Sequence, residues 1–161
     1  MLNVGDFAFD FDLPTSDGKI IKLSDRLKLH SPILIVFYKF DCPTCQFTFK
    51  HLPHILNQLG DEHFLAIAQD AQVETEKFKA SYSYQGNIVC DVKPYPVSSK
   101  FGITFVPTFF VVEQDLKISN VGEGFDKIII DNFSKKIALA KSISQFQTFR
   151  PAEQVPLLKP G

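Results

Sequence analysis

Short, almost wholly apolar runs alternate along this chain with longer segments in which apolar and polar residues are interspersed. The apolar runs are typical of strands buried on both faces of a sheet, and they cover residues 33–38, 64–68, 87–90 and 108–112. The interspersed segments predict helices at about 43–59, 73–82 and 128–143, with one or two helical turns in 94–101. We therefore predict an α/β fold with a mixed central sheet and helices on both faces.

Turn residues and short strands flank this alternating pattern. Apolar and acidic residues are interspersed in 7–13, and residues 16–19 have the composition of a turn. Residues 20–23 form a short apolar strand. These features predict an N-terminal β-hairpin extension. Near the other end, the strand at 108–112 is expected to pair with a hairpin partner at 117–121.

Two features of the predicted helices follow from individual residues. Pro53 lies inside the helix at 43–59 and is expected to kink it. In the helix at 128–143, apolar residues recur at a spacing that predicts one buried face; they are Ile129, Phe133, Ile137 and Ala140.

The end of the chain differs in composition from the rest. Residues 145–161 contain Pro151, Pro156 and Pro160, which are incompatible with a sustained helix. We therefore divide the chain into a domain at 1–144 and a proline-containing tail at 145–161, which we expect to be docked or frayed.

Composition narrows the class of protein. A chain of 161 residues that is 45% hydrophobic is long enough for one substantial core. Lys and Arg number 17 against 18 Asp and Glu, and no block of one sign occurs, so we expect no nucleic-acid partner. No apolar stretch approaches the roughly 20 residues that cross a bilayer, and no leader pattern is seen. We expect a cytoplasmic protein without membrane insertion, or an extracytoplasmic one if a leader has been removed.

The most informative chemistry follows the buried strand at 33–38. Cys42-Pro43-Thr44-Cys45 stands where this strand gives way to a helix. Two thiols at this spacing can close a small disulfide, and a helix N-terminus stabilises a thiolate on the first. The arrangement predicts electron transfer between thiols and disulfides.

Charged neighbours of the first thiol act in opposite directions. Lys39 favours the thiolate of Cys42, whereas Asp41 opposes it.

Three stretches resemble the thioredoxin-like superfamily, specifically its redoxin (AhpC/TSA) branch, which the ResA/TlpA-type thiol-disulfide oxidoreductases and the peroxiredoxins share. They are the opening segment at 4–25, the strand and cysteine pair at 37–45, and Gly102-Ile103 followed by Val106-Pro107-Thr108. The likeness covers about residues 3–140. The chain departs from the family pattern by lacking Trp and by having Asp41, Ala8 and Val36 at positions where the family keeps other residues.

The resemblance implies a thioredoxin-like fold and assigns roles to the motif residues. Cys42 would attack a substrate disulfide and Cys45 would resolve the mixed disulfide. Val106-Pro107 would be a cis peptide lying against the disulfide, with the backbone of Val106 free to pair with an extended substrate. Candidate supporting residues are Pro43, Thr44, Lys39, Asp41 and Gln69.

The expected partners follow from the same roles. They are a protein or low-molecular-weight disulfide substrate and a thiol reductant or reductase, with no cofactor and no metal, in a monomer or weak dimer.

Gln69 and Asp70 end a predicted strand, where they either assist proton transfer or serve as turn and cap residues. Cys90 is expected to be a small apolar filler.

Alternative functions remain open at this point. A peroxiredoxin-like thiol peroxidase is one, although Lys39 and Ile35 occupy the positions where that pattern needs Thr or Ser and Pro, and no Arg lies between Arg26 and Arg150. A non-enzymatic thioredoxin-fold adaptor or metal carrier is another. A zinc site using His51 and His54 with the cysteine pair would require the helix to break, for instance at Pro53.

Overall fold

A five-stranded mixed sheet forms the centre of the computed structural model, which describes residues 1–161. The strand order is β5-β4-β3-β6-β7. The central strand β3 (Ile33–Tyr38) runs parallel to β4 (Phe64–Ala68), and β4 runs parallel to β5 (Asn87–Cys90). On its other edge β3 is antiparallel to β6 (Thr108–Val112), which pairs in turn with β7 (Ile118–Glu123). The predicted mixed sheet is confirmed.

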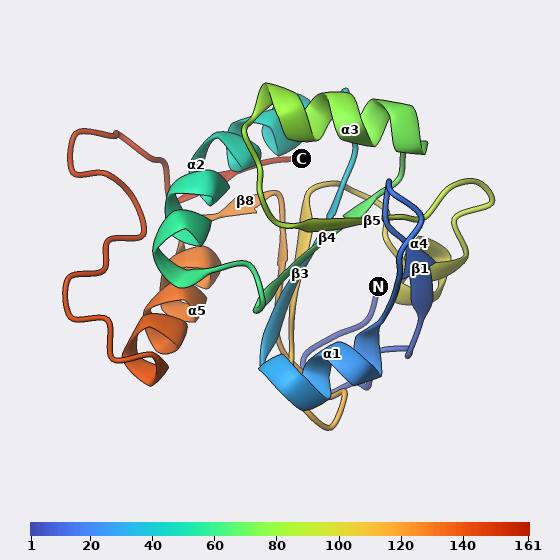
Figure 1. Cartoon of the computed structure of the whole chain (residues 1–161), viewed down its shortest axis with the longest axis horizontal. Coiled ribbons are helices and arrows are strands. Elements are labelled where there is room, and N and C mark those ends of the chain that lie inside the picture. Colours follow the sequence, from blue (N-terminus) through green and yellow to red (C-terminus); the bar gives the residue numbers. More distant parts are fainter.

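Side chains of β3 divide the core into two halves because successive residues of a strand point to opposite faces. Leu34, Val36 and Tyr38 pack in one buried cluster with residues of α2 (Pro43–Leu59), α3 (Gln72–Ser81) and α5 (Lys127–Ala140). The alternate residues of β3 pack in the other with α1 (Leu23–His30) and α4 (Pro96–Phe101). Figure 1 shows these helices around the sheet. All six residues of β3 are buried, which explains the absence of polar residues from that run.

The N-terminal hairpin is present and consists of β1 (Asp12–Pro14) and β2 (Ile20–Lys22), paired antiparallel. The helix α1 that follows directly was not predicted. Its buried side chains are Leu23 and Leu27, one turn apart, and the rest of the helix is mostly polar. An eight-residue helix with one apolar pair gives too weak a periodic pattern to recognise.

The long helices agree with expectation in their position and differ in detail. α2 begins at Pro43, ends at Leu59 and continues through Pro53 as one helix. In α5, Phe133 and Ile137 are buried as predicted, but Ile129 is only half-buried and Ala140 is exposed. The buried face instead includes Ile130, Ser134 and Ala138. The residues that follow Ile129, Phe133 and Ile137 therefore belong to the buried face, and Ala140 is the last residue of the helix.

The C-terminal segment folds back on the domain. After α5 it passes outside the helices and returns to pair β9 (Leu158–Lys159) antiparallel with β8 (Phe125–Asp126). In Figure 1 the end marked C lies by the first turns of α2. No helix of the structure has the length and apolar character needed to cross a membrane.

Candidate active site

Cys42 is the N-cap residue of α2. Its backbone is extended, with φ −80° and ψ 118°, and its Sγ accepts a hydrogen bond from the backbone N–H of Cys45 at 3.3 Å. Pro43 follows at the first helical position, where its missing N–H leaves no bond unmade. The Cys42 side chain is half-buried, and its sulfur lies at the end of the helix where unpaired N–H groups favour negative charge.

Cys45 has a different environment, one helical turn further on. Its side chain is fully buried and packs in the cluster between the sheet and α2. Burial raises the pKa of the Cys45 thiol well above its ordinary value. The two sulfur atoms are not bonded to each other, so the structure shows a dithiol with one accessible and one buried member.

The Val106-Pro107 peptide is cis, as the family resemblance implied, and it lies beside Cys42. The Cys42 thiol donates a hydrogen bond to the carbonyl oxygen of Val106 at 3.3 Å. The loop is held in place because the N–H of Gly124 donates to the carbonyl oxygen of Pro107 at 2.7 Å. The register of β6 with β3, in which Thr108 faces Phe37, brings this loop to the carboxyl end of β3 where the cysteine pair begins.

The charged residues before the cysteine pair are closer to solvent. Lys39 is half-buried and Asp41 is exposed, and no ion pair joins either of them to a partner. The loop is held instead by Asp70, whose Oδ2 accepts a hydrogen bond from the N–H of Phe40 at 2.8 Å. Burial raises the pKa of this carboxyl group. Gln69 donates its backbone N–H to the carbonyl oxygen of Tyr38 at 3.0 Å and so extends the β3–β4 pairing.

Thr44 joins the site to the C-terminal segment. Its hydroxyl, which is buried, donates a hydrogen bond to the carbonyl oxygen of Pro160 at 2.6 Å. Gly161 lies against the backbone of Val106 so closely that a Cβ on Gly161 would overlap the Val106 carbonyl oxygen. The family resemblance implies a Val106 backbone free to pair with a substrate; in the structure its carbonyl oxygen accepts a hydrogen bond from the Cys42 thiol, and Gly161 lies against it. Sequence reasoning missed these contacts because Thr44 and Pro160 are 116 residues apart.

The remaining candidate residues lie elsewhere. Cys90 is buried in β5, as expected of an apolar filler. The His51 ring contacts Glu153, Phe47 and Phe149, while Gln58 lies beside the His54 ring. No group of three or more His, Cys, Asp or Glu side chains comes together in a way that could hold a metal ion.

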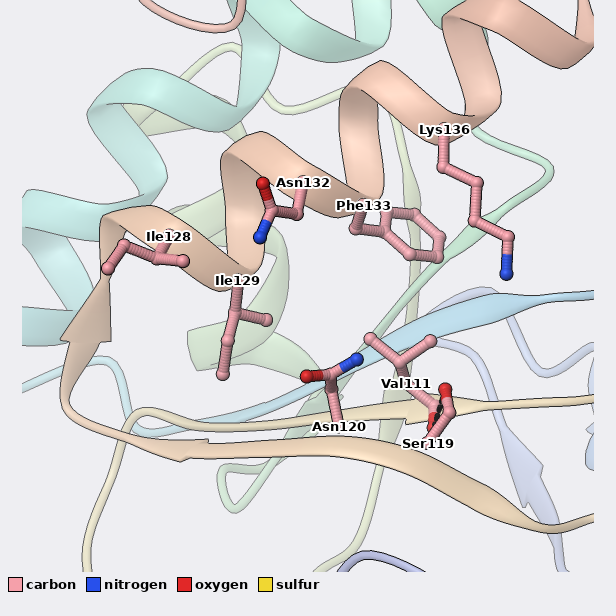
Figure 2. Close-up of a pocket in the computed structure, with 8 residues that line it drawn as sticks. All are labelled: Val111, Ser119, Asn120, Ile128, Ile129, Asn132, Phe133 and Lys136. Atoms are coloured by element: carbon pink, nitrogen blue, oxygen red, sulfur yellow. Dashed lines mark hydrogen bonds between the residues drawn. The ribbon is translucent and has the colours of Figure 1, made fainter.

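A small cavity of about 120 Å³ lies between β7 and α5, away from the cysteine pair (Figure 2). Amide side chains of Asn120 and Asn132 and the hydroxyl of Ser119 line it together with apolar residues. Its strand residue Val111 faces Leu34, near the start of β3, whereas the cysteines follow the end of β3. This cavity has no thiol, and its one charged side chain, Lys136, pairs with Glu113, so we assign it no chemistry.

The fold and the site together define a thioredoxin-like protein with a dithiol at a helix N-terminus beside a cis-proline loop. The chain belongs to the AhpC/TSA family, whose model matches residues 4–121. The resemblance to the redoxin branch is thereby confirmed. No curated protein matches the chain.

Solved structures with the same fold come from several bacteria. A structure described as thiol:disulfide interchange protein DsbE from Chlorobium tepidum is 24% identical, with a TM-score of 0.71, and the match covers 87% of this chain and 98% of that one. A structure described as that of a protein disulfide isomerase from Bacteroides thetaiotaomicron is 15% identical, with a TM-score of 0.74, covering 85% and 89% of the two chains. Peroxidoxin BcpB from Mycobacterium tuberculosis is 22% identical, with a TM-score of 0.70, covering 90% and 100%. These likenesses confirm the thioredoxin-like fold.

Proposed function

We propose that this protein is a thiol-disulfide oxidoreductase in which Cys42 and Cys45 alternate between the dithiol and the disulfide. The observation that carries the proposal is the position of the Cys42 sulfur, which lies 3.3 Å from the N–H of Cys45 and 3.3 Å from the carbonyl oxygen of Val106. The first contact stabilises a thiolate, and the second places the sulfur at the loop where an extended substrate would lie.

The first step is attack of the Cys42 thiolate on one sulfur of a substrate disulfide. The substrate S–S bond breaks, a mixed disulfide forms through Cys42, and the other substrate sulfur leaves as a thiolate that takes up a proton. Cys42 is suited to this step because its sulfur is the more accessible of the pair.

The second step uses Cys45, which burial keeps protonated in the resting dithiol. As Cys45 attacks the Cys42 sulfur, its proton passes to the departing substrate sulfur and the mixed disulfide breaks. The products are a fully reduced substrate and an oxidised Cys42–Cys45 bridge. A thiol reductant or reductase must then return two electrons to the bridge, and the same steps in reverse would oxidise a substrate dithiol.

A thiol peroxidase is the second candidate because the AhpC/TSA family model matches the chain. The arginines argue against it. Arg26 donates to the carbonyl oxygens of Asp61 and Phe64, at the start of β4, whereas the cysteines follow the opposite end of the sheet. Arg150 pairs with Glu153 in the C-terminal segment. Arg26 therefore lies at the wrong end of the sheet to polarise a peroxide at Cys42, and the guanidinium of Arg150 is engaged by Glu153.

The test uses a mixed-disulfide trap with the full chain. In Cys45→Ser, the resolving thiol is gone, so Cys42 should accumulate a covalent adduct with a peptide disulfide, detected by mass on the peptide that contains Cys42. Cys90→Ser removes the remaining thiol and is the matched control; it should turn over insulin disulfides like the wild type and trap nothing. A wild type that does not reduce insulin, together with a Cys45→Ser variant that forms no adduct, would contradict the proposal.

A further inference from the structure

Residues 157–161 run as an extended segment along the side of the site on which the cis-proline loop lies. Their pairing with β8 is antiparallel, with Lys159 opposite Phe125 and Leu158 opposite Asp126, and the N–H of Lys127 donates to the carbonyl oxygen of Leu157 at 2.9 Å. Addition of extended backbone to the edge of a strand is one recurring way in which a protein binds a peptide.

The far end of this segment lies next to the reactive sulfur. Pro160 accepts the hydrogen bond from the Thr44 hydroxyl at 2.6 Å, and Gly161 lies against Val106, whose carbonyl oxygen also accepts from the Cys42 thiol. A Cβ at Gly161 would lie 3.0 Å from the Val106 carbonyl carbon and closer still to its oxygen, so only glycine fits this close approach. The segment therefore covers the Val106 backbone that an extended substrate would need.

Few contacts hold the segment in place. Leu157 and Leu158 are 64% and 63% exposed, so releasing them uncovers little apolar surface. The Lys159 ammonium lies 5.9 Å from the centre of the Phe47 ring, a weak interaction between two half-buried residues. Segments with few buried contacts and a short hydrogen-bonded pairing open at low free-energy cost.

An open groove of about 350 Å³ remains beside the segment, lined by Phe105, Glu123 and Gly124 together with residues 158–161. The Phe105 side chain, which lines this groove, is 59% exposed. An arriving polypeptide therefore has an apolar surface to contact before it meets the Val106 backbone.

We propose that residues 157–161 are an internal competitor for the substrate groove beside Cys42, so that an extended polypeptide disulfide must displace them before it reacts. This inference rests on the proposed function, since it names the substrate class and the regulation of the same site. A small disulfide without a peptide backbone does not need the groove and reacts whether or not the segment is in place. If the segment is open about a tenth of the time, the apparent affinity for a polypeptide falls about tenfold.

The test compares two substrates in the full chain. The probe pair is insulin, as a polypeptide disulfide, and bis(2-hydroxyethyl) disulfide, as a small one. Rates are measured with pre-reduced wild type, with Gly161→Val, which places a side chain against Val106, and with Ala152→Val, a matched control at an exposed position of the same tail. Amide hydrogen exchange of the peptide that ends at residue 161 reports whether the segment is docked.

We expect Gly161→Val to speed amide exchange in 157–161 and to raise the insulin rate, relative to the small-disulfide rate, about tenfold, with Ala152→Val unchanged in both. If amide exchange shows that the segment is released but the ratio of the insulin rate to the small-disulfide rate is unchanged, the competitor role is overturned. Unchanged exchange in Gly161→Val would show that Gly161 does not touch Val106 and would also overturn it. Failure of the proposed function looks different, because the wild type would then reduce neither substrate.

Discussion

The carboxylate of Asp70 accepts a hydrogen bond from the backbone N–H of Phe40 at 2.8 Å, and this bond ties the end of β4 to the loop that leads into Cys42. Asp70 is 7% exposed, so water does not readily replace the bond. The Asp70 side chain therefore helps to position the Cys42 thiol without touching it.

Replacing Asp70 tests this positioning role. Asp70→Ala leaves the Phe40 N–H without its partner and should lower the free energy of unfolding by about 1–3 kcal/mol, measured by urea denaturation. Asp70→Asn keeps an acceptor oxygen and should lose less. Equal losses in the two variants would show that the acceptor oxygen which asparagine keeps contributes nothing, and would contradict this positioning role.

The Cys42 and Cys45 thiols should differ in reactivity as pH rises. Burial raises the pKa of Cys45, so its thiolate stays scarce well above neutral pH, whereas Cys42 is accessible at the helix end. Brief treatment of the reduced protein with iodoacetamide between about pH 7 and 9 should modify Cys42 and spare Cys45, as read from peptide masses. Alkylation of both thiols at similar rates would mean that Cys45 is not enclosed in solution.

Phe49 connects the cysteine helix to the core. Its ring is fully buried and lies 4.6 Å from the ring of Tyr38, 4.8 Å from that of Phe78 and 5.0 Å from that of Tyr84, centre to centre. Phe49→Ala should reduce the free energy of unfolding by about 3–5 kcal/mol through the cavity that it leaves. Phe49→Leu keeps most of the volume and should cost clearly less. A loss below 1 kcal/mol in Phe49→Ala, measured by denaturant unfolding, would contradict this packing.

His51 should make the stability of the protein depend on pH. Burial lowers the pKa of its imidazole below the ordinary 6.5, and Glu153 opposes this shift while Lys50 and Arg150 add to it. Because the folded state binds the proton less tightly than the unfolded state, stability is complete above pH 6.5 and is lost as pH falls through the lower folded value.

The measurement is the unfolding free energy of wild type and His51→Gln at a series of pH values from 8 to about 5. Wild type should lose more stability over this range than His51→Gln, because glutamine does not titrate. Parallel curves for the two proteins would show that His51 is not the group responsible.

Local patterns accounted for most of the scaffold. Strand β3 and the start of α2 were predictable because six apolar residues stop shortly before a Cys-Pro pair, and proline fits the first helical position. Helix α1 was missed since Leu23 and Leu27 are its only buried residues. The cysteine pair and the cis-proline loop were recognisable as motifs, although they are far apart in the sequence.

Local sequence patterns could not predict the contacts of the C-terminal segment. The partner of β9 is β8, only two residues long, and it carries no alternation that would mark it as a strand. The hydrogen bond from Thr44 to Pro160, which joins the C-terminal segment to the site, connects residues that are far apart in the sequence. Such contacts depend on where the chain returns after α5, and the three prolines of the tail predict only that it is not helical.

A redox titration of the full chain against glutathione, followed by mass analysis of the peptide containing residues 42–45, tests the central claim most directly. As the buffer becomes more oxidising, this peptide should lose two hydrogen atoms in one reversible transition, which marks closure of the Cys42–Cys45 bridge. A peptide that stays reduced throughout, or that gains glutathione on Cys42 without closing a bridge, would contradict the account.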